Sequence, residues 1–127
     1  KKNLGYVPQF DSLSPAPSVY ETLLFAVQLR CVLTPAQCRG RVADLLHTIG
    51  LVGVKDIRVA QLSGGQQKIL SIGVGLVSLP DVLFLDEPTT GLDSTAADAV
   101  VSTVKGIVDM GRTVILTIHQ PSPIVFS

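Results

Sequence analysis

The sequence is poor in charged residues, and those it has are balanced. Charged residues make up 16% of the 127 positions, and ten Lys and Arg residues offset ten Asp and Glu residues. The basic residues are scattered between Lys1 and Arg112, whereas nucleic-acid-binding proteins usually gather them into one patch. We therefore expect no nucleic acid as a main partner.

Long apolar runs and cysteine pairs are also missing. One uncharged apolar run, residues 69–80, has twelve residues and contains glycines, whereas a membrane-spanning helix needs about twenty apolar residues. Cys31 and Cys38 have neither Cys-x-x-Cys spacing nor a neighbouring histidine, so nothing indicates a zinc site or a disulfide scaffold. The sequence predicts no bilayer-crossing segment, and its cysteines favour a reducing, cytosolic environment.

Apolar residues, in contrast, are abundant. They make up 46% of the chain, and the mean hydropathy is +0.46, which is high for a soluble domain of this size. A chain of this length should bury about two thirds of its unfolded surface, so a hydrophobic core is possible. The excess predicts either a large interior or apolar surface that contacts another molecule.

Helix start signals occur at four places. Ser18 and Glu21 have capping-box spacing and predict a helix over residues 19–30. Thr34 stands before a proline and predicts the start of a second helix, which Gly50 should end.

The third predicted helix begins within the Ser-Gly-Gly-Gln segment at residues 63–66 and runs to about Ser78. Two glycines inside it each cost about 1 kcal/mol relative to alanine. Ser94 is expected to cap a fourth helix that runs to about Met110.

Three short apolar segments, at residues 3–7, 82–85 and 112–118, predict strands. Residues 82–85 are apolar throughout and residues 112–118 mostly so, and we expect both strands to be buried in a parallel sheet. A helix separates these two strands, which indicates a parallel α/β fold.

Polar residues follow each predicted strand: Gln9 after the first, Asp86 and Glu87 after the second, and His119 after the third. Open parallel sheets bind ligands outside the carboxyl ends of their strands. If the three strands form one sheet, these four side chains should converge on one edge.

Two adjacent carboxylates after a buried strand suit phosphoryl chemistry. Asp86 could hold Mg²⁺ through water, and Glu87 could orient or deprotonate an attacking water. General-base help of this kind contributes about 10² to 10⁴ in rate. The short Asp-Glu-Pro sequence on its own fits equally well a strand that runs into an acidic turn.

The Ser-Gly-Gly-Gln segment at residues 63–66 offers a hydroxyl group, approachable backbone N–H groups and the positive end of a helix dipole, which suit a phosphate. The alternative is a capped helix after a glycine turn. The acidic pair about twenty residues downstream favours the phosphate site.

These segments together resemble the nucleotide-binding domain of an ATP-binding cassette (ABC) transporter. Gln9 resembles the Q-loop, residues 62–66 the signature motif, residues 82–87 Walker B, residues 91–93 the D-loop, and His119 the switch histidine. The five motifs occur in the family's order and span nearly the whole chain.

The resemblance implies an α/β fold with a P-loop NTPase-like parallel sheet and a helical subdomain inserted between Q-loop and signature motif. Residues 1–10 would hold the first strand and the Q-loop, residues 11–80 the helical subdomain with the signature, and residues 81–127 Walker B, D-loop and switch region. No Gly-x-x-x-x-Gly-Lys-Ser/Thr occurs. Since the family has that Walker A loop upstream of the Q-loop, we expect the domain to be N-terminally incomplete and inactive alone.

The resemblance also implies ATP and Mg²⁺ as cofactors. Gln9 would sense Mg²⁺, Asp86 would hold it through water, Glu87 would polarise the attacking water, and His119 would contact the γ-phosphate. 

Ser63, Gly64, Gly65 and Gln66 would serve the site of a second nucleotide-binding domain, since the family packs two domains head to tail. Asp93 would lie at that junction.

Finer details resemble the G subfamily, whose half-transporters export lipids, sterols, pigments and drugs. Residues 86–94 and 117–121 resemble the sequence pattern of that subfamily. The Leu-Ser-Gly-Gly-Gln signature departs from the subfamily's usual Val-Ser-Gly-Gly-Glu-Arg. The resemblance implies a domain on the cytosolic face of a membrane, attached to a transmembrane domain.

Three alternatives remain. An ATPase head of a chromosome-structuring or DNA-repair protein would need a long coiled coil between Q-loop and signature, but only 52 residues separate Gln9 from Leu62. A soluble, translation-associated member of the superfamily shares the motifs. A non-catalytic fragment, with exposed apolar surface and a tendency to associate, is the third.

Overall fold

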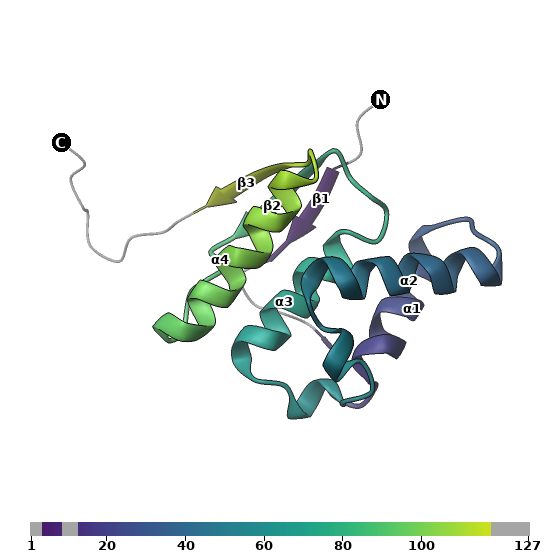
Figure 1. Ribbon diagram of the computed structural model, residues 1–127, viewed down its shortest axis with the longest axis horizontal. Helices are drawn as coiled ribbons and strands as arrows, with labels where there is room; N and C mark the ends of the chain where they lie inside the picture. Colours follow the sequence, from purple (N-terminus) through teal and green to yellow (C-terminus); the bar gives the residue numbers. More distant parts are fainter. Residues whose placement is uncertain (1–3, 9–12, 118–127) are drawn as a thin grey trace.

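The computed structural model describes residues 4–8 and 13–117, which form a small parallel sheet and four α-helices. The elements are β1 (Leu4–Val7), α1 (Val19–Arg30), α2 (Pro35–Ile49), two 3₁₀ turns (Val52–Val54 and Val59–Gln61), α3 (Gly64–Gly75), β2 (Val82–Asp86), α4 (Ser94–Asp109) and β3 (Thr113–Thr117). Figure 1 shows α1 and α2 beside the sheet and α4 across it.

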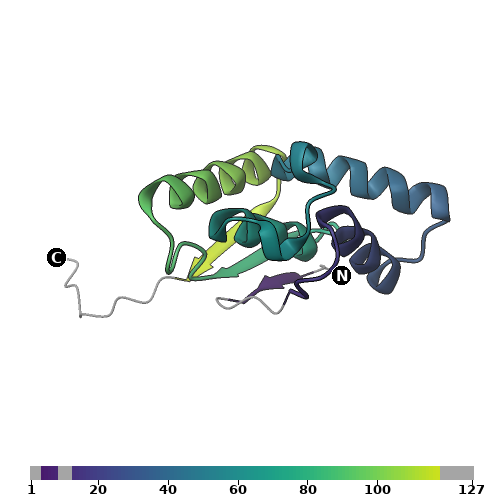
Figure 2. The same ribbon diagram turned by 90° about the horizontal axis from the view of Figure 1, so that it is seen from below.

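The three strands form one parallel sheet in the order β1-β2-β3. The first residues of the three strands pair with one another, Leu4 with Val82 and Val82 with Thr113. Seen from below, the helices lie on one side of this sheet (Figure 2). This arrangement confirms the parallel α/β architecture expected of a P-loop NTPase-like sheet.

The expected burial of both later strands is wrong. In β2, Leu83 and Leu85 are fully buried under the helices, but the alternate residues are partly exposed. In β3, Ile115 is 42% and Leu116 46% exposed. The reason is that, within residues 4–8 and 13–117, helices cover one face only and β3 stands at the edge of the sheet.

The first two helices begin and end where their capping signals predict. The Glu21 backbone N donates to Ser18 Oγ at 3.1 Å, and the Ser18 backbone N donates to Glu21 Oε1 at 2.8 Å. Thr34 forms the same reciprocal pair with Gln37. Gly50 ends α2 in the left-handed region at φ +73°, which glycine adopts without strain.

The later helices differ slightly from expectation. Helix α3 ends at Gly75, three residues before the predicted Ser78. Asp93, rather than Ser94, caps α4, because its Oδ1 accepts from the Ala96 backbone N at 2.8 Å and Ser94 is already helical. Both residue types cap helices well, so the side-chain geometry decides between them.

Arginines satisfy the carbonyl groups that follow α3. Arg41 of α2 donates to the Val77 carbonyl oxygen. Arg112, which directly precedes β3, donates to the carbonyl oxygens of Leu79 at 3.0 Å and Pro80 at 2.9 Å. The link between α3 and β2 is therefore held from both the helical part and the sheet.

Helix α3 lies against β1 at a contact made by glycines. A Cβ atom on Gly75 would be 2.7 Å from Val7 Cγ2, and one on Gly5 would be 2.9 Å from the Gly75 carbonyl oxygen. Real Cβ atoms do not approach that closely, so both positions require glycine. The other sides of α3 contact α1, α2 and α4, which makes this helix the centre of the core.

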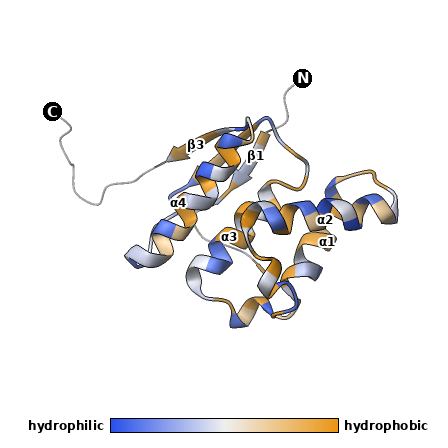
Figure 3. Cartoon of the chain, viewed as in Figure 1, coloured by the Kyte–Doolittle hydropathy of each residue, from blue (hydrophilic) through white to orange (hydrophobic). Residues whose placement is uncertain are grey.

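Large apolar side chains remain exposed on β1 and α1, among other places. Leu4 and Tyr6 lie on the uncovered face of the sheet, with 64% and 61% of their surface exposed. Phe25 and Leu29 of α1 are exposed at 63% and 69%. Figure 3 shows orange apolar segments along α1 and β1, as well as on the helices that face the core. These surfaces account for much of the apolar excess in the composition.

None of the helices in the described part of the chain has the length and apolarity required to cross a bilayer.

Two matched substitutions test the contact of α3 with β1. Gly75→Ala should lower the free energy of unfolding by about 1–3 kcal/mol, because the new methyl group collides with Val7. Gly106→Ala in α4, where the added Cβ meets no atom within 4 Å, should raise it by up to about 1 kcal/mol through helix propensity. Chemical denaturation of both variants measures the difference, and equal effects would contradict the proposed packing.

Candidate functional site

The carboxyl ends of the three strands share one edge of the sheet, as expected from the sequence. The strands are parallel and adjacent, and their last residues at this edge are Val7, Asp86 and Thr117. Gln9 and His119 follow β1 and β3 by two residues each and lie outside the described residues. Of the four side chains expected to converge, the structure therefore describes Asp86 and Glu87.

Asp86 is held between its two neighbouring strands. Its Oδ1 accepts from Thr117 Oγ1 of β3 at 2.6 Å, and its Oδ2 accepts from the Tyr6 hydroxyl of β1 at 3.3 Å. Sequence reasoning missed Tyr6 and Thr117. The register of the sheet reveals both residues, since Thr117 pairs directly with Asp86 and Tyr6 pairs with the residue two positions before it.

Asp86 also changes the acidity of Tyr6. Loss of hydration, the negative charge of Asp86 and the hydrogen bond to it all raise the pKa of the Tyr6 hydroxyl above its usual 10.0. Each cause acts on the phenolate, which is less hydrated and faces a carboxylate. Tyr6 therefore stays protonated and keeps donating to Asp86 at neutral pH.

Glu87 leaves the strand in an unusual conformation. Its φ is +44°, in the left-handed region that non-glycine residues rarely adopt, at a cost of about 1–3 kcal/mol. The side chain is buried, with 8% of its surface exposed, and Oε2 accepts from Thr90 Oγ1 at 3.3 Å. The backbone N of Glu87 donates to the Thr117 carbonyl oxygen at 3.0 Å. Thr117 thus contacts both acidic residues.

The Ser-Gly-Gly-Gln segment forms a capped start of α3. Ser63 Oγ accepts from the Gln66 backbone N at 3.1 Å, and Gln66 Oε1 accepts from the Ser63 backbone N at 3.0 Å. The structure thus contains the capped helix. This cap does not exclude phosphate binding, because the first N–H groups of a helix, here those of Gly64 and Gly65, have no intrahelical acceptor.

The two signature glycines have different surroundings. Gly65 is buried against α4, where a Cβ atom would lie 2.9 Å from Ala96 Cβ. Gly64 is exposed, and a Cβ atom there would lie 3.4 Å from Leu92 Cδ2. Asp93 follows Leu92 directly and is exposed as the cap of α4. The expected signature and D-loop segments are therefore neighbours within this chain.

A groove runs along α1 beside the segment that precedes it. It has a volume of about 820 Å³ and is lined by Leu13, Pro17, Phe25, Leu29 and Val74, among others. Phe25 and Leu29 are its most exposed apolar side chains. The groove is continuous with the residues that follow the predicted Q-loop.

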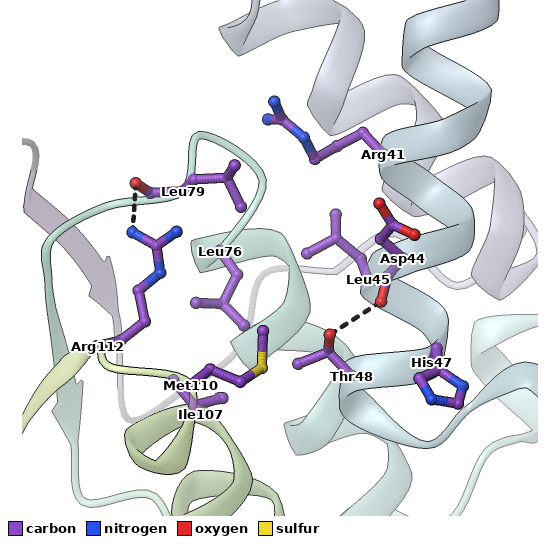
Figure 4. Close-up of a pocket in the computed structure, with 10 residues that line it drawn as sticks. All are labelled: Arg41, Asp44, Leu45, His47, Thr48, Leu76, Leu79, Ile107, Met110 and Arg112. Carbon is purple, nitrogen blue, oxygen red and sulfur yellow. Dashed lines mark hydrogen bonds between the residues drawn. The ribbon is translucent and has the colours of Figure 1, made fainter.

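A second cavity, of about 440 Å³, lies at the opposite edge of the sheet, between α2, the end of α3 and the end of α4 (Figure 4). Leu45, Leu76 and Ile107 form its apolar floor. Arg112 stands at its side and donates to Leu79, as described above. Since Arg112 precedes β3 and Leu79 precedes β2, this cavity adjoins the amino ends of the strands, away from the acidic pair.

Comparison with known proteins identifies a common family. A family model described as ABC transporter matches residues 1–90. The chain is 47% identical over 127 residues to ABC transporter G family member 5 of Arabidopsis thaliana. This match covers 95% of the chain and 20% of that protein. It is 44% identical to ABC transporter G family member STR2 of Petunia hybrida, over 96% of the chain and 18% of that protein. It is 45% identical to ABC transporter G family member 43 of Arabidopsis thaliana, over 96% of the chain and 9% of that protein. The chain thus spans about a fifth or less of the length of these relatives.

The contact between Tyr6 and Asp86 can be tested by titration. In a Tyr20→Phe background, Tyr6 is the one remaining tyrosine, and Asp86→Asn should lower its pKa because the neighbouring negative charge is gone. Since a raised pKa stabilises the fold below about pH 10 and the effect fades as pH rises through the folded-state pKa, Asp86→Asn should also reduce the loss of stability at alkaline pH. Ultraviolet absorbance of the phenolate measures the pKa, and Asp98→Asn serves as the control. An unchanged Tyr6 pKa would refute the contact.

Proposed function

Because the chain belongs to the ABC transporter family, we propose that it forms part of a domain that binds and hydrolyses ATP to drive export of a lipid-like or other hydrophobic substrate. Its relatives are G family members. The observation that carries the proposal is the pair Asp86 and Glu87 at the carboxyl edge of a parallel sheet, where nucleotides bind in such folds.

Asp86 is suited to hold Mg²⁺. Its carboxylate oxygens accept hydrogen bonds from Tyr6 and Thr117, which hold the side chain in place, and an ionised carboxylate is a ligand type that suits Mg²⁺. Among the described residues, no three His, Cys, Asp or Glu side chains lie close enough to hold a metal by themselves. That arrangement fits Mg²⁺, which proteins usually bind through one or two carboxylates, waters and the substrate's phosphates. When bound with ATP, the ion would neutralise charge on the phosphates.

Glu87 is proposed as the residue that polarises the attacking water. Its carboxylate is buried, and Thr90 Oγ1 donates a hydrogen bond to one of its oxygens, which restricts the directions in which the carboxylate can point. The strained backbone of Glu87 supports the assignment, since such strain gathers at functional sites. By family resemblance, Gln9 would sense Mg²⁺ and His119 would contact the γ-phosphate.

The signature residues Ser63, Gly64, Gly65 and Gln66, with Asp93, are proposed to serve the ATP site of a second nucleotide-binding domain. The exposure of Ser63, Gly64 and Asp93 on neighbouring segments supports such a contact. The N–H groups at the start of α3 and the helix dipole would stabilise a γ-phosphate there. Two copies, or this domain and a related one, would then share two ATP molecules.

The remaining proposals concern how the chain is divided into subdomains and where the domain lies in the complete protein. We propose that residues 1–10 and 81–127 belong to the nucleotide-binding sheet and that residues 11–80 form the helical subdomain. The sequence holds no Gly-x-x-x-x-Gly-Lys-Ser/Thr, so hydrolysis should require a protein that contains this loop. The domain would lie on the cytosolic face of a membrane, with its transmembrane domain against the groove of α1.

Glu87→Gln in the complete protein tests the catalytic assignment. ATP hydrolysis should fall by about 10² to 10⁴, because the amide cannot accept a proton from water, whereas nucleotide binding should persist. Steady-state ATPase rates and binding of a fluorescent ATP analogue measure the two effects. Asp98→Asn on the exposed side of α4 is the control, and unchanged turnover in Glu87→Gln would remove Glu87 from this role.

Hydrogen exchange tests the proposed contact with the transmembrane domain. Amides of α1 should exchange more slowly in the complete protein than in the 127-residue chain, because the groove is covered. Phe25→Asp should restore fast exchange at little cost in stability, since the side chain is exposed. Val32→Asp, at an exposed position that does not line the groove, is the control. Equal exchange in the two proteins would place the transmembrane domain elsewhere.

A further inference from the structure

Lys68 is a buried, charged residue that has no role in the proposed mechanism. Among the described residues, the buried ionisable side chains are Lys68, 5% exposed, and Glu87, 8% exposed. Burying an ammonium group is costly unless hydrogen bonds compensate for lost water. Glu87 has a place in the chemistry, so the burial of Lys68 calls for a separate explanation.

Lys68 bridges two segments that are far apart in the sequence. Its Nζ donates to the Pro8 carbonyl oxygen at 2.7 Å, across 60 residues. Pro8 directly follows β1 and directly precedes Gln9. A hydrogen bond from a charged donor is about twice as strong as a neutral one, so the bond fixes the backbone at the carboxyl end of β1.

The bond is the second of two contacts that align α3 with β1. Gly75 meets Gly5 and Val7 near the end of the helix, and Lys68 reaches Pro8 seven residues earlier. The contacts of the later helix residue are with Gly5 and Val7, and that of the earlier helix residue is with Pro8. Helix α3 therefore runs antiparallel to β1.

We propose that Lys68 is a positioning residue that holds Pro8, at the end of β1 and one residue before Gln9, at a fixed distance from the start of α3. The inference rests on the proposed function, in which Gln9 serves this chain's ATP site and Ser63 serves the partner's. Lys68 then links the two ATP sites mechanically within one chain. Movement of β1's end on nucleotide binding is passed to the signature helix through this bond.

Kinetics of the complete protein test the link. Lys68→Met removes the charge and keeps the length of the side chain, and it should lower kcat for ATP hydrolysis about 3- to 30-fold while KM changes less than about twofold. Lys68→Arg keeps a donor and should recover most of kcat. Lys55→Met, at an exposed lysine, should have no effect. Unchanged kcat in Lys68→Met, or failure of arginine to rescue it, would overturn the proposal.

A double-mutant cycle separates positioning from general destabilisation. If Lys68 acts through the Gln9 segment, adding Lys68→Met to Gln9→Ala should lower kcat little further, because coupled residues give non-additive effects. Multiplicative losses would show that Lys68 acts independently of Gln9 and would overturn the proposal.

Hydrogen exchange gives a readout that needs no ATPase activity. Lys68→Met should speed amide exchange of the peptide that contains residues 4–10, whereas Lys68→Arg and Lys55→Met should leave it unchanged. If the wild-type complete protein hydrolyses no ATP, the proposed function fails, and exchange still decides whether Lys68 anchors Pro8. Equal exchange in all variants would show that it does not.

Discussion

Helix α3 touches β1 with no side chain between the two backbones at the point of closest contact. Glycine stands on both sides of it, at Gly5 and Gly75. This approach places α3 among α1, α2, α4 and the sheet, so that its apolar residues form the middle of the core. It also brings Lys68 within hydrogen-bonding distance of Pro8. A larger residue at either glycine would push the end of α3 away from β1.

The sheet is covered on one face only, and this asymmetry sets where its polar chemistry lies. Leu83 and Leu85 point into the helices, so the alternation of the strand places Asp86 on the open face. There it meets Tyr6 and Thr117 from the neighbouring strands. Glu87, one residue later, has a left-handed backbone conformation, and its side chain is buried. Two adjacent carboxylates thereby acquire different environments, as a metal ligand and a water-polarising base would require.

Local signals were sufficient to predict much of the fold. The capping residues Ser18 and Thr34 and the terminating Gly50 act within one turn of their own helix, so the sequence contains all the information needed. Burial of β2 and β3 depends on which neighbours cover each face, and apolar composition does not reveal that. The choice between Asp93 and Ser94 as cap likewise depends on the geometry of the preceding turn, which ends at Gly91 with φ +79°.

The candidate site was predictable to a similar extent. Asp86 and Glu87 could be placed because they directly follow an apolar strand, whereas Tyr6 and Thr117 became visible only with the register of the sheet. Lys68 could not be found from sequence, because a single lysine in a helix is ordinarily solvated.

Thr117 explains why the strain at Glu87 is tolerated. Its hydroxyl fixes the Asp86 side chain, and its carbonyl oxygen accepts from the Glu87 backbone N. The ladder between β2 and β3 therefore continues one residue beyond β2, into the position where φ becomes positive. A hydrogen bond there contributes about 1 kcal/mol, comparable with the lower range of the strain, and Thr90 adds its backbone bond to the Glu87 carbonyl oxygen. The sheet edge and the following turn together hold a conformation that an isolated strand end would abandon, so the fold itself fixes the direction of the Glu87 side chain.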